Sequence, residues 1–324
     1  METTRLGTSG LQISELTLGC MSFGESKQGT HEWTLPEDES RVLIKAAVDA
    51  GFTTFDTANS YSAGTGEEFL GRALKDFTRR EEIVIASKVF FRMHPGPKGG
   101  GLSRGAIIQQ AEDSLRRLGT DYIDLYQIHR WDDEVPIEET LSALDDLVRS
   151  GKVRYIGASS MFAWQFSKAQ YTADAIGATR FVSMQDHYNL LNREDEREMH
   201  PLCLDQGVGV LPWSPLARGL LARPWGERTG RTETDLVTAK LYTDTQEADK
   251  AVIDNVGRVA EGRGISRAQV SLAWLRQRPV VSSIIVGATK LSHLTEAVDS
   301  LDVDLTAEEI ALLEEAYVPH PFGF

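Results

Sequence analysis

Eight short apolar runs alternate with amphipathic helical patterns, and this alternation limits the possible folds more than any other feature of the sequence. The predicted strands are 16–20, 52–57, 82–88, 122–129, 153–159, 181–185, 208–214 and 283–288. The clearest predicted helices, 39–51, 104–119 and 137–151, end at Gly51, Gly119 and Gly151, as glycine favours a helix C-terminus. Because strand and helix alternate in this way, the sequence predicts an α/β fold of the (β/α)8 TIM barrel type.

A doubly wound sheet is the alternative α/β fold, but it normally carries a glycine-rich fingerprint after its first strand. The run Gly99–Gly101 lies instead in a loop rich in proline and glycine, RMHPGPKGGG at 92–101. No internal repeat or linker divides the chain, so we expect residues 1–324 to form a single barrel domain.

Segments at both ends of the chain fall outside the barrel pattern. RLGTSGLQIS at 5–14 predicts an N-terminal β-hairpin that turns at Ser9 and Gly10, since glycine provides the positive φ of a tight turn. LTAEEIALLEEAY at 305–317 predicts an extra C-terminal helix with Thr306 as its N-cap.

Two connections, 90–103 and 214–245, are longer than ordinary turns. Long loops in a compact domain usually serve as lids or binding loops, so we expect both to contribute to ligand binding.

Charge and cysteine content disfavour several classes of function. The formal net charge is −14 and no run of Lys and Arg interrupts the acidic balance, so we expect no nucleic acid and no anionic membrane as partner. The two cysteines, Cys20 and Cys203, provide neither a disulfide framework nor a Cys-x-x-Cys metal motif. The start of the chain lacks an apolar signal segment, and no later stretch is long enough to span a membrane. We expect a cytoplasmic protein without a metal, as a monomer or weak homo-oligomer.

The predicted strands end in polar residues, which an apolar core would not require. These residues are Asp56, Lys88, His129, Ser159, Ser160, Gln185 and Ser214. Each has an ordinary explanation when taken alone, such as a capping role for Asp56. In a TIM barrel, however, catalytic groups lie at the C-terminal strand ends, so their occurrence together predicts an active site there.

Asp56, Lys88 and Tyr61 predict a site for proton transfer. A buried lysine needs an anionic partner, and Asp56 on the adjacent predicted strand supplies one. Tyr61 follows closely in the segment GFTTFDTANSY. We expect the Lys88 charge to lower the pKa of Tyr61, about 10 in isolation, toward neutrality and so to make Tyr61 a general acid.

Six segments together resemble the successive signatures of the aldo-keto reductase superfamily. They are GFTTFDTANSY, IASKV, DLYQIHR, GKVRYIGASS, MQDHYNLLNRE and PWSPLARGLL, in the family's order and over essentially the whole chain. HRW at 129–131, SSM at 159–161 and the final PHPFGF resemble a bacterial subgroup of general aldo/keto reductases. The resemblance implies a barrel that binds NADP(H) across its strand ends, without a Rossmann fold, and reduces carbonyl compounds by hydride transfer.

By this resemblance, Asp56, Tyr61, Lys88 and His129 form a catalytic tetrad. Tyr61 would protonate the carbonyl oxygen, Lys88 held by Asp56 would lower the tyrosine pKa, and His129 would orient the carbonyl. His129 is expected to be a neutral imidazole, since a second positive charge beside Lys88 is unfavourable.

The resemblance also implies the cofactor positions. Ser159, Ser160 and Gln185 are expected at the nicotinamide carboxamide, with Trp213 stacked on the ring. The other expected cofactor positions are Gly19, Cys20, Met21, Asp56, Ser214, Pro215, Leu216, Ala217, Arg218, Gly219, Arg223, Gly287, Thr289, Lys290, His293 and Glu296. The segment from Ser214 would bind the pyrophosphate, with Arg218 and Arg223 as its cations.

The segment 286–297 is expected at the adenosine phosphate. It departs from the family pattern at two positions: many NADP-preferring relatives have Arg where His293 stands and Asn where Ala297 stands. A third departure lies at the carboxamide position, where many relatives have Asn in place of Ser160. Lys290 supplies a charge near the same helix N-terminus, so NADPH is expected rather than NADH.

The substrate is expected to be a small-molecule carbonyl compound. Trp33, Tyr61, Phe91, His129 and Trp131 are expected to line its pocket. Sugars, sugar phosphates, small aldehydes and polycyclic ketones all remain open as substrates. Two other functions also remain open, a nicotinamide-binding sensor with little turnover and a Schiff-base aldolase that uses Lys88.

Overall fold

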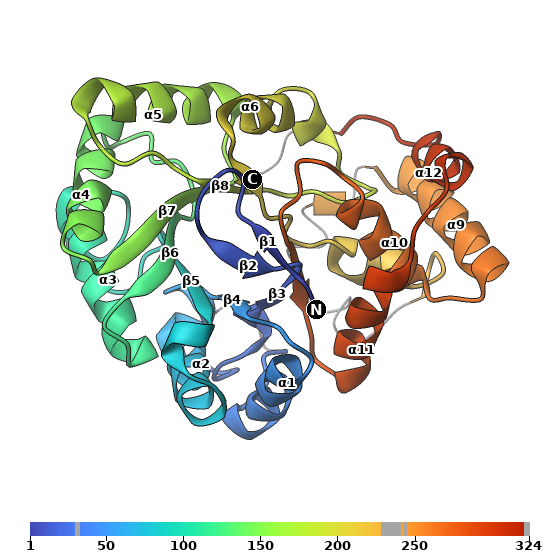
Figure 1. Ribbon diagram of the computed structural model, residues 1–324, viewed down its shortest axis with the longest axis horizontal. Helices are drawn as coiled ribbons and strands as arrows, with labels where there is room; N and C mark the ends of the chain where they lie inside the picture. Colours follow the sequence, from blue (N-terminus) through green and yellow to red (C-terminus); the bar gives the residue numbers. More distant parts are fainter. Residues whose placement is uncertain (30–32, 228–240, 243–244, 321–324) are drawn as a thin grey trace.

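A computed structural model describes residues 1–29, 33–227, 241–242 and 245–320, and its central feature is an eight-stranded parallel sheet (Figure 1). The strands are β3 (Leu16–Gly19), β4 (Thr54–Asp56), β5 (Val84–Val89), β6 (Ile123–Ile128), β7 (Val153–Ser159), β8 (Ser183–Gln185), β9 (Gly209–Val210) and β10 (Ile284–Gly287). Their order is β10-β3-β4-β5-β6-β7-β8-β9. Val210 of β9 also forms a parallel bridge with Val281, just before β10, which joins the two edges of the sheet into a barrel.

All eight predicted strands are present, most of them shorter than the apolar runs that predicted them. β4 begins at Thr54 because the Phe52 N–H donates to the Ala47 carbonyl oxygen, 3.0 Å away, at the end of the preceding helix. β9 ends at Val210, but the Leu211 and Trp213 N–H groups still donate to the Met184 and Asp186 carbonyl oxygens, at 2.9 Å and 2.8 Å.

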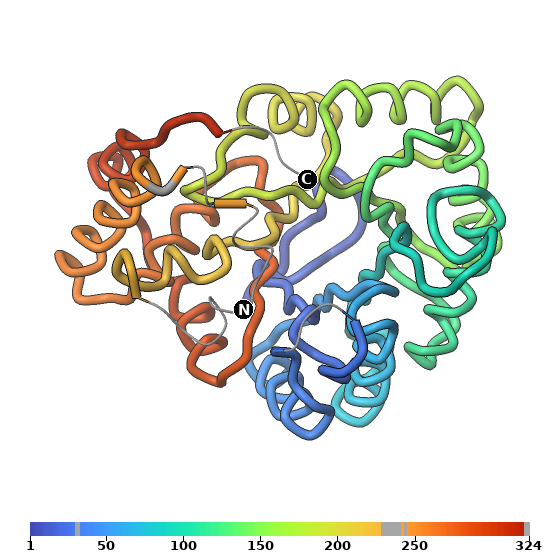
Figure 2. Tube along the Cα trace, turned by 180° about the vertical axis from the view of Figure 1, so that it is seen from behind, coloured from blue at the N-terminus to red at the C-terminus, as the bar shows by residue number. Residues whose placement is uncertain are grey.

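Helices surround the sheet on its outer face (Figures 1 and 2). They are α1 (Glu37–Asp49), α2 (Thr65–Phe77), α3 (Arg104–Leu118), α4 (Ile137–Arg149), α5 (Ala163–Ile176), α6 (Met199–Gln206), α9 (Gln246–Arg263), α10 (Arg267–Arg276), α11 (Leu291–Asp299) and α12 (Ala307–Glu314). Short 3-10 helices are η1 (Cys20–Ser22), η2 (Tyr61–Gly64), η3 (Arg80–Glu82), η4 (Glu194–Glu196), η5 (Ala217–Ala222) and η7 (Ser300–Asp302). α9 and α12 pack together outside α10 (Figure 1).

The amphipathic patterns predicted the helices because each helix buries one face. α4, for example, buries Ile137, Leu141 and Leu144 against the sheet layer and keeps Glu138 and Glu139 near its N-terminus. The predicted ends are confirmed, because the glycines that follow α1, α3 and α4 have φ values of 88°, 65° and 75°.

The predicted C-terminal helix is α12. Its N-cap is Thr306, whose side chain accepts a hydrogen bond from the Glu309 N–H, while the Glu309 side chain accepts from the Thr306 N–H. This reciprocal pair is a capping box and fixes where the helix begins.

The predicted N-terminal hairpin is present as β1 (Thr3–Arg5) and β2 (Gln12–Ser14). The predicted turn is wrong in detail, because Gly7 has a φ of 57° whereas Gly10 does not lie in the left-handed region. The reason is tertiary: a Cβ on Gly7 would lie 2.3 Å from the Gly207 carbonyl oxygen, where the hairpin crosses the barrel.

The hairpin packs against one end of the barrel, where it lies in front of the sheet in Figure 1. Its side chains Leu6, Leu11 and Ile13 share a buried cluster with the barrel residues Val84 and Leu125. Because these contacts cover the N-terminal strand ends, the C-terminal strand ends lie on the opposite side.

The two long connections differ from simple turns. Residues 90–103 contain neither helix nor strand, and the described part of 214–245 includes η5. Residues 228–240 and 243–244 of the second connection lie outside the described residues. Across the described ranges, no helix combines the length and apolar character needed to cross a bilayer.

Candidate active site

The C-terminal ends of the parallel strands gather the predicted site residues at one end of the barrel. In the sheet register, Gly19 lies beside Asp56. Ser159 lies beside Gln185. Residues far apart in the chain therefore become neighbours because their strands end at the same level.

Asp56, Lys88 and Tyr61 form a hydrogen-bonded group. Lys88 Nζ lies 2.5 Å from Asp56 Oδ1, 2.9 Å from the Thr57 carbonyl oxygen and 3.3 Å from Tyr61 Oη. Lys88 is 0% exposed and Asp56 is 3% exposed. The structure therefore contains the buried ion pair, in contact with the tyrosine, that the sequence predicts.

The segment after β4 remains attached to β5 and so carries Tyr61 toward the lysine. The Thr57 N–H donates to the Ala86 carbonyl oxygen at 2.9 Å, and the Asn59 N–H donates to the Lys88 carbonyl oxygen at 3.2 Å. Because these bonds continue the strand pairing beyond β4, they fix the start of η2, where Tyr61 lies.

The second oxygen of Asp56 accepts hydrogen bonds from two buried amides. Gln185 Nε2 donates to Asp56 Oδ2 at 2.8 Å, and Gln127 Nε2 donates to the same atom at 3.1 Å. Gln185 was expected at the nicotinamide carboxamide, but here its nitrogen is committed to Asp56. Gln127 is missing from the predicted site, although a polar residue between Tyr126 and Ile128 is a signal of a buried polar role.

The pKa of Tyr61 differs in direction from the expectation. Burial raises the pKa of Tyr61 above its usual value, and the positive charges of Lys88 and Arg130 oppose this effect without outweighing it. The expected lowering of the Tyr61 pKa toward neutrality is therefore wrong for this structure, because the desolvation of a phenolate, together with the negative charge of Asp56, outweighs the positive charges. Tyr61 is protonated at neutral pH and can act as a proton donor.

Lys88 is positively charged, whereas His129 is neutral. Burial alone would lower the pKa of Lys88, but Asp56 and Tyr61 reverse the effect and raise it, so the lysine is charged. Burial, together with the charges of Lys88 and Arg130, lowers the pKa of His129 well below its usual value. The predicted neutral imidazole is confirmed, and the His129 ring lies edge-on to the Tyr61 ring with centroids 6.0 Å apart.

The predicted nicotinamide positions lie at the ends of β7 and β9. The Ser159 and Ser160 hydroxyl oxygens are 3.2 Å apart, and Trp213 Nε1 donates to Ser160 Oγ at 3.1 Å. One face of the Trp213 indole stacks on the His187 ring, with centroids 4.2 Å apart and planes at 11°. His187 is missing from the predicted site, because only the tertiary structure places it behind the tryptophan.

The turn after β9 has a backbone geometry suited to an anion. Ser214, Ala217, Arg218 and Gly219 have φ values of 52°, 46°, 56° and 100°. Such turns can direct backbone N–H groups toward a common anion. Arg218 is 7% exposed, so it is not a solvated loop residue. A Cβ on Gly219 would lie 3.0 Å from the Arg223 guanidinium, so this second arginine lies along the same turn.

The remaining predicted cofactor positions follow neighbouring strand ends. They are Gly19, Cys20 and Met21 at the junction of β3 and η1, Pro215 and Leu216 before η5, and Gly287, Thr289, Lys290, His293 and Glu296 between β10 and α11. Lys290 is exposed at the start of α11, and the Thr289 N–H donates to His293 Nδ1 at 3.3 Å. These residues share the end of the barrel that holds the ion pair.

Aromatic side chains border the predicted tetrad. Phe91 is 40% exposed and meets His129 edge-on at 4.8 Å between centroids. Trp131 meets Trp164 of α5 at 6.2 Å. Trp164 is 59% exposed and is missing from the predicted pocket, since it belongs to another strand–helix unit. Trp33 is partly buried in the connection between β3 and α1.

Backbone strain marks the same end of the barrel. Within the described residues, the non-glycine residues with positive φ are Ser62, Ala63, Ser160, Ser214, Ala217 and Arg218. All of them follow the C-terminal ends of β4, β7 or β9. Such conformations cost about 1–3 kcal/mol each and cluster at functional sites, which supports a site at these strand ends.

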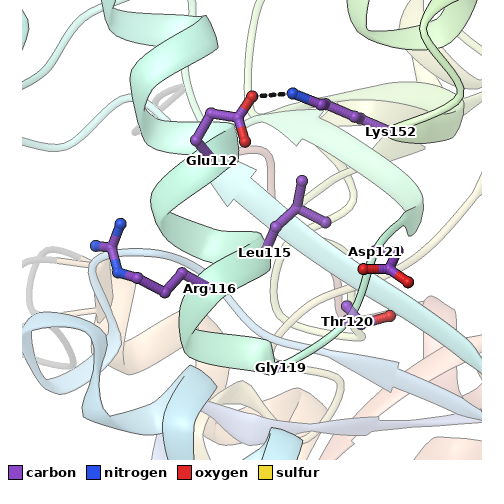
Figure 3. Close-up of a pocket in the computed structure, with 7 residues that line it drawn as sticks. All are labelled: Glu112, Leu115, Arg116, Gly119, Thr120, Asp121 and Lys152. Carbon is purple, nitrogen blue, oxygen red and sulfur yellow. Dashed lines mark hydrogen bonds and ion pairs between the residues drawn. The ribbon is translucent and has the colours of Figure 1, made fainter.

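A shallow depression of about 400 Å³ lies elsewhere on the molecule (Figure 3). Its lining consists of Glu112, Leu115, Arg116, Gly119, Thr120, Asp121 and Lys152. Glu112 and Lys152 form an ion pair across it, where the chain enters β6 and β7. It is therefore at the N-terminal strand ends, away from the tetrad. In the described part of the chain, no group of three or more His, Cys, Asp and Glu side chains is placed to hold a metal ion.

Comparison with known proteins adds an independent assignment. Residues 15–318 match the aldo/keto reductase family. The chain is 47% identical to versiconal hemiacetal acetate reductase of Aspergillus parasiticus, over 99% of this chain and 99% of that protein. It is 44% identical to a proposed aryl-alcohol dehydrogenase of Schizosaccharomyces pombe, over 98% of this chain and 95% of that protein. It is 41% identical to another from Saccharomyces cerevisiae, over 98% of each chain.

These relatives are fungal, so the expected closeness to a bacterial subgroup is not confirmed. The family match nevertheless covers almost the whole barrel, including every strand from β3 to β10. The names of the relatives describe reductases and dehydrogenases, which are both oxidoreductases. The chain belongs to the aldo/keto reductase family and is an oxidoreductase that acts on carbonyl compounds.

Proposed function

We propose that this protein catalyses the NADPH-dependent reduction of an aldehyde or ketone to an alcohol, with Tyr61 as the general acid. The observation that carries the proposal is the position of Lys88 Nζ, 2.5 Å from Asp56 Oδ1 and 3.3 Å from Tyr61 Oη. A charged lysine there stabilises the phenolate that forms when Tyr61 gives up its proton.

The proton balance follows from the charge states. Tyr61 begins protonated and donates its hydroxyl proton to the carbonyl oxygen, while the carbonyl carbon receives a hydride. Bound NADPH would supply that hydride. The Lys88 ammonium compensates the negative charge on the Tyr61 oxygen until a proton from water restores the phenol. Asp56 keeps the ammonium charged and fixed in place.

His129 can orient the carbonyl without competing as an acid. Its imidazole is neutral, and its Nδ1 is a buried atom that has no hydrogen-bond partner in the described structure. Because Nδ1 is buried, a carbonyl oxygen would have to meet the other ring nitrogen, Nε2, which can carry the proton of the neutral imidazole and donate it.

The donors of the strand ends fit a nicotinamide dinucleotide. Ser159 and Ser160 offer hydroxyl groups beside Trp213, whose indole offers a flat apolar surface. The positive-φ turn at η5 and the cation of Arg218 suit a pyrophosphate. Lys290 at the start of α11 adds an exposed cation suited to a further phosphate, which favours NADPH over NADH.

Two other functions were open from the sequence. A Schiff-base aldolase needs an uncharged lysine, but Asp56 raises the pKa of Lys88 and keeps it as the ammonium. A nicotinamide-binding sensor would be expected to lack part of the tetrad geometry, whereas Asp56, Lys88 and Tyr61 are hydrogen-bonded together.

We further propose an aryl or polycyclic carbonyl compound as the substrate class. Phe91 meets the His129 ring edge-on, and Trp131, two residues after His129, contacts the exposed Trp164. The relatives include a protein named for a versiconal hemiacetal acetate and others named for aryl alcohols, which supports the same class.

The test combines cofactor binding with turnover. The protein is titrated with NADPH and NADH by quenching of tryptophan fluorescence. NADPH oxidation is then followed by the loss of its absorbance, with benzaldehyde-type and short aliphatic aldehydes as substrates. Tyr61→Phe should bind NADPH like the parent protein and lose roughly 10²- to 10⁴-fold in turnover, because it removes only the proton donor.

The outcomes separate the alternatives. A protein that binds neither cofactor is not a nicotinamide enzyme, and borohydride trapping of a carbonyl compound on Lys88 would then identify the aldolase. A single turnover of bound NADPH without further cycles would identify the sensor. Full turnover by the Tyr61→Phe variant would refute the proposed role of Tyr61 as the general acid.

A further inference from the structure

His187 is a buried histidine outside the tetrad, and its ring lies flat against Trp213. The centroids are 4.2 Å apart and the planes differ by 11°. The backbone supports the stack, because the two residues form a parallel bridge and the Trp213 N–H donates to the Asp186 carbonyl oxygen at 2.8 Å. His187 is 3% exposed, so one face of the indole is covered by an enclosed imidazole.

Both nitrogens of the His187 ring have protein partners. Nε2 lies 2.7 Å from Tyr242 Oη, and Nδ1 lies 3.1 Å from Asn192 Nδ2. Amide nitrogens lie near both ring nitrogens, because Asn189 Nδ2 is 3.3 Å from Nε2, and the Tyr242 hydroxyl can donate or accept at that edge of the ring. Asn189 Nδ2 donates to the same tyrosine oxygen at 3.1 Å. We call His187, Asn189, Asn192 and Tyr242 the His187 cluster.

The His187 ring is neutral, and both of its nitrogens form hydrogen bonds within the protein. Burial, followed by the positive charges of Arg218, His320 and Arg130, lowers the pKa of His187 to about 3. Because both nitrogens are hydrogen-bonded within the protein and the ring stays neutral, His187 does not exchange protons with a substrate. Its function must therefore depend on its shape and position.

The His187 cluster also reaches the segment expected to bind the pyrophosphate. Asn189 Nδ2 donates to the Ser214 carbonyl oxygen at 3.0 Å, at the first residue of the positive-φ turn. One cluster thus contacts both the Trp213 indole and the start of this turn.

We infer that His187 is a positioning residue that holds Trp213 at the angle required by the nicotinamide ring, with Tyr242 and Asn192 fixing the imidazole from its two edges. The inference rests on the proposed nicotinamide-dependent function. A flat ring held in this way prevents rotation of the indole, so the second indole face keeps one orientation for a flat heteroaromatic ring.

The experiment measures NADPH binding to variants of the cluster. His187→Ala should weaken NADPH binding about 3- to 10-fold, the change expected from the loss of one aromatic pair. His187→Phe keeps a flat ring but loses the hydrogen bonds of the imidazole, and Tyr242→Phe removes only the hydroxyl group beside Nε2, so each should weaken binding less than His187→Ala. Tyr171→Phe, at an exposed tyrosine of α5, is the matched control and should bind NADPH like the parent.

A double substitution tests whether His187 acts through the tryptophan. In a Trp213→Ala background, His187→Ala should cause no further loss of NADPH affinity. Near-ultraviolet circular dichroism of the cofactor-free protein gives a second measure, because His187→Ala should reduce the tryptophan signal while far-ultraviolet spectra show an intact fold.

The experiments distinguish a failure of the positioning role from a failure of the proposed function. Unchanged NADPH affinity in His187→Ala and His187→Phe, or an equal loss with and without Trp213, overturns the positioning role while the proposed function stands. Failure of the parent protein to bind either NADPH or NADH overturns the proposed function and this inference together.

Discussion

Lys88 shows how a single buried charge links stability to chemistry. Its ammonium group has Asp56, the Thr57 carbonyl oxygen and Tyr61 as partners, and water cannot replace them because the side chain is fully buried. The carboxylate depends on the lysine in turn, with Gln127 and Gln185 as its other donors. Removing either charge therefore leaves the other without full compensation.

Lys88→Met should destabilise the protein by about 3–5 kcal/mol, because Asp56 becomes an uncompensated buried charge. The double variant Lys88→Met with Asp56→Asn should recover part of that loss, since no charge remains. Urea unfolding followed by circular dichroism measures both free energies of unfolding. Lys45→Met is the matched control, because Lys45 forms an exposed pair with Asp49 and should cost no more than about 1 kcal/mol. A double variant that is no more stable than Lys88→Met would contradict the argument.

The strand ends of the barrel units supply the proposed tetrad, and the loops and helices after those strands supply the aromatic side chains of the proposed substrate pocket. Trp131 lies in the loop after β6, and Trp164 lies in the first turn of α5, the helix that follows β7. The contact between the two rings therefore joins two successive strand–helix units. Trp164 is the more exposed member, at 59%. An exposed aromatic side chain in this position can stack on a flat substrate at little cost to the fold.

Trp164→Ala should raise KM for aryl aldehydes about 3- to 10-fold and leave KM for short aliphatic aldehydes nearly unchanged, because only a flat ring gains from stacking. Steady-state kinetics with a matched pair of aldehydes makes the comparison. Tyr171→Ala on the same helix, 60% exposed, serves as the control. Equal effects on both aldehydes would argue against an aromatic subsite.

Across the whole molecule, the end of the described chain is attached to two distant parts of the barrel. Tyr317 Oη donates to Glu194 Oε1 at 2.5 Å, and the His320 N–H donates to the same oxygen at 3.0 Å. His320 Nε2 also lies 2.9 Å from Asp249 Oδ1 on α9. The chain after α12 therefore connects the loop after β8 with α9.

The stability that His320 contributes should fall as pH rises. Burial alone would lower the pKa of His320, but the hydrogen bond and charge of Asp249 reverse this and raise it. A raised pKa means that the folded state holds the proton more tightly. The contribution is therefore complete below the unfolded-state value of about 6.5 and is lost as pH rises through the higher folded-state pKa.

His320→Gln should reduce the free energy of unfolding by about 1.5–3 kcal/mol near pH 6, the usual range for a hydrogen bond to a charged group, and by less near pH 9. Urea titrations at both pH values give the difference. His94→Gln, at an exposed histidine, should show no such pH-dependent difference. A loss of the same size at both pH values would show that His320 contributes only by packing.

The architecture, and the grouping of the predicted tetrad residues at one end of the barrel, could be predicted from the sequence. Apolar runs and helical periodicity predicted all eight barrel strands, because both patterns arise from local spacing. The polar residues at strand ends, together with the family resemblance, predicted a site that contains Asp56, Tyr61, Lys88 and His129, and the structure brings these four side chains together. Parallel strands end at one side of a barrel, so this grouping follows from the order of the elements.

The behaviour of those groups, and the contacts that support them, depend instead on the folded barrel. The upward shift in the pKa of Tyr61 depends on burial, which no local pattern reports. The second donors to Asp56 and the stack of His187 on Trp213 join residues from different strand–helix units. Local spacing fixes which side of a strand or helix a residue occupies, whereas desolvation and contacts between distant segments arise only when the barrel closes.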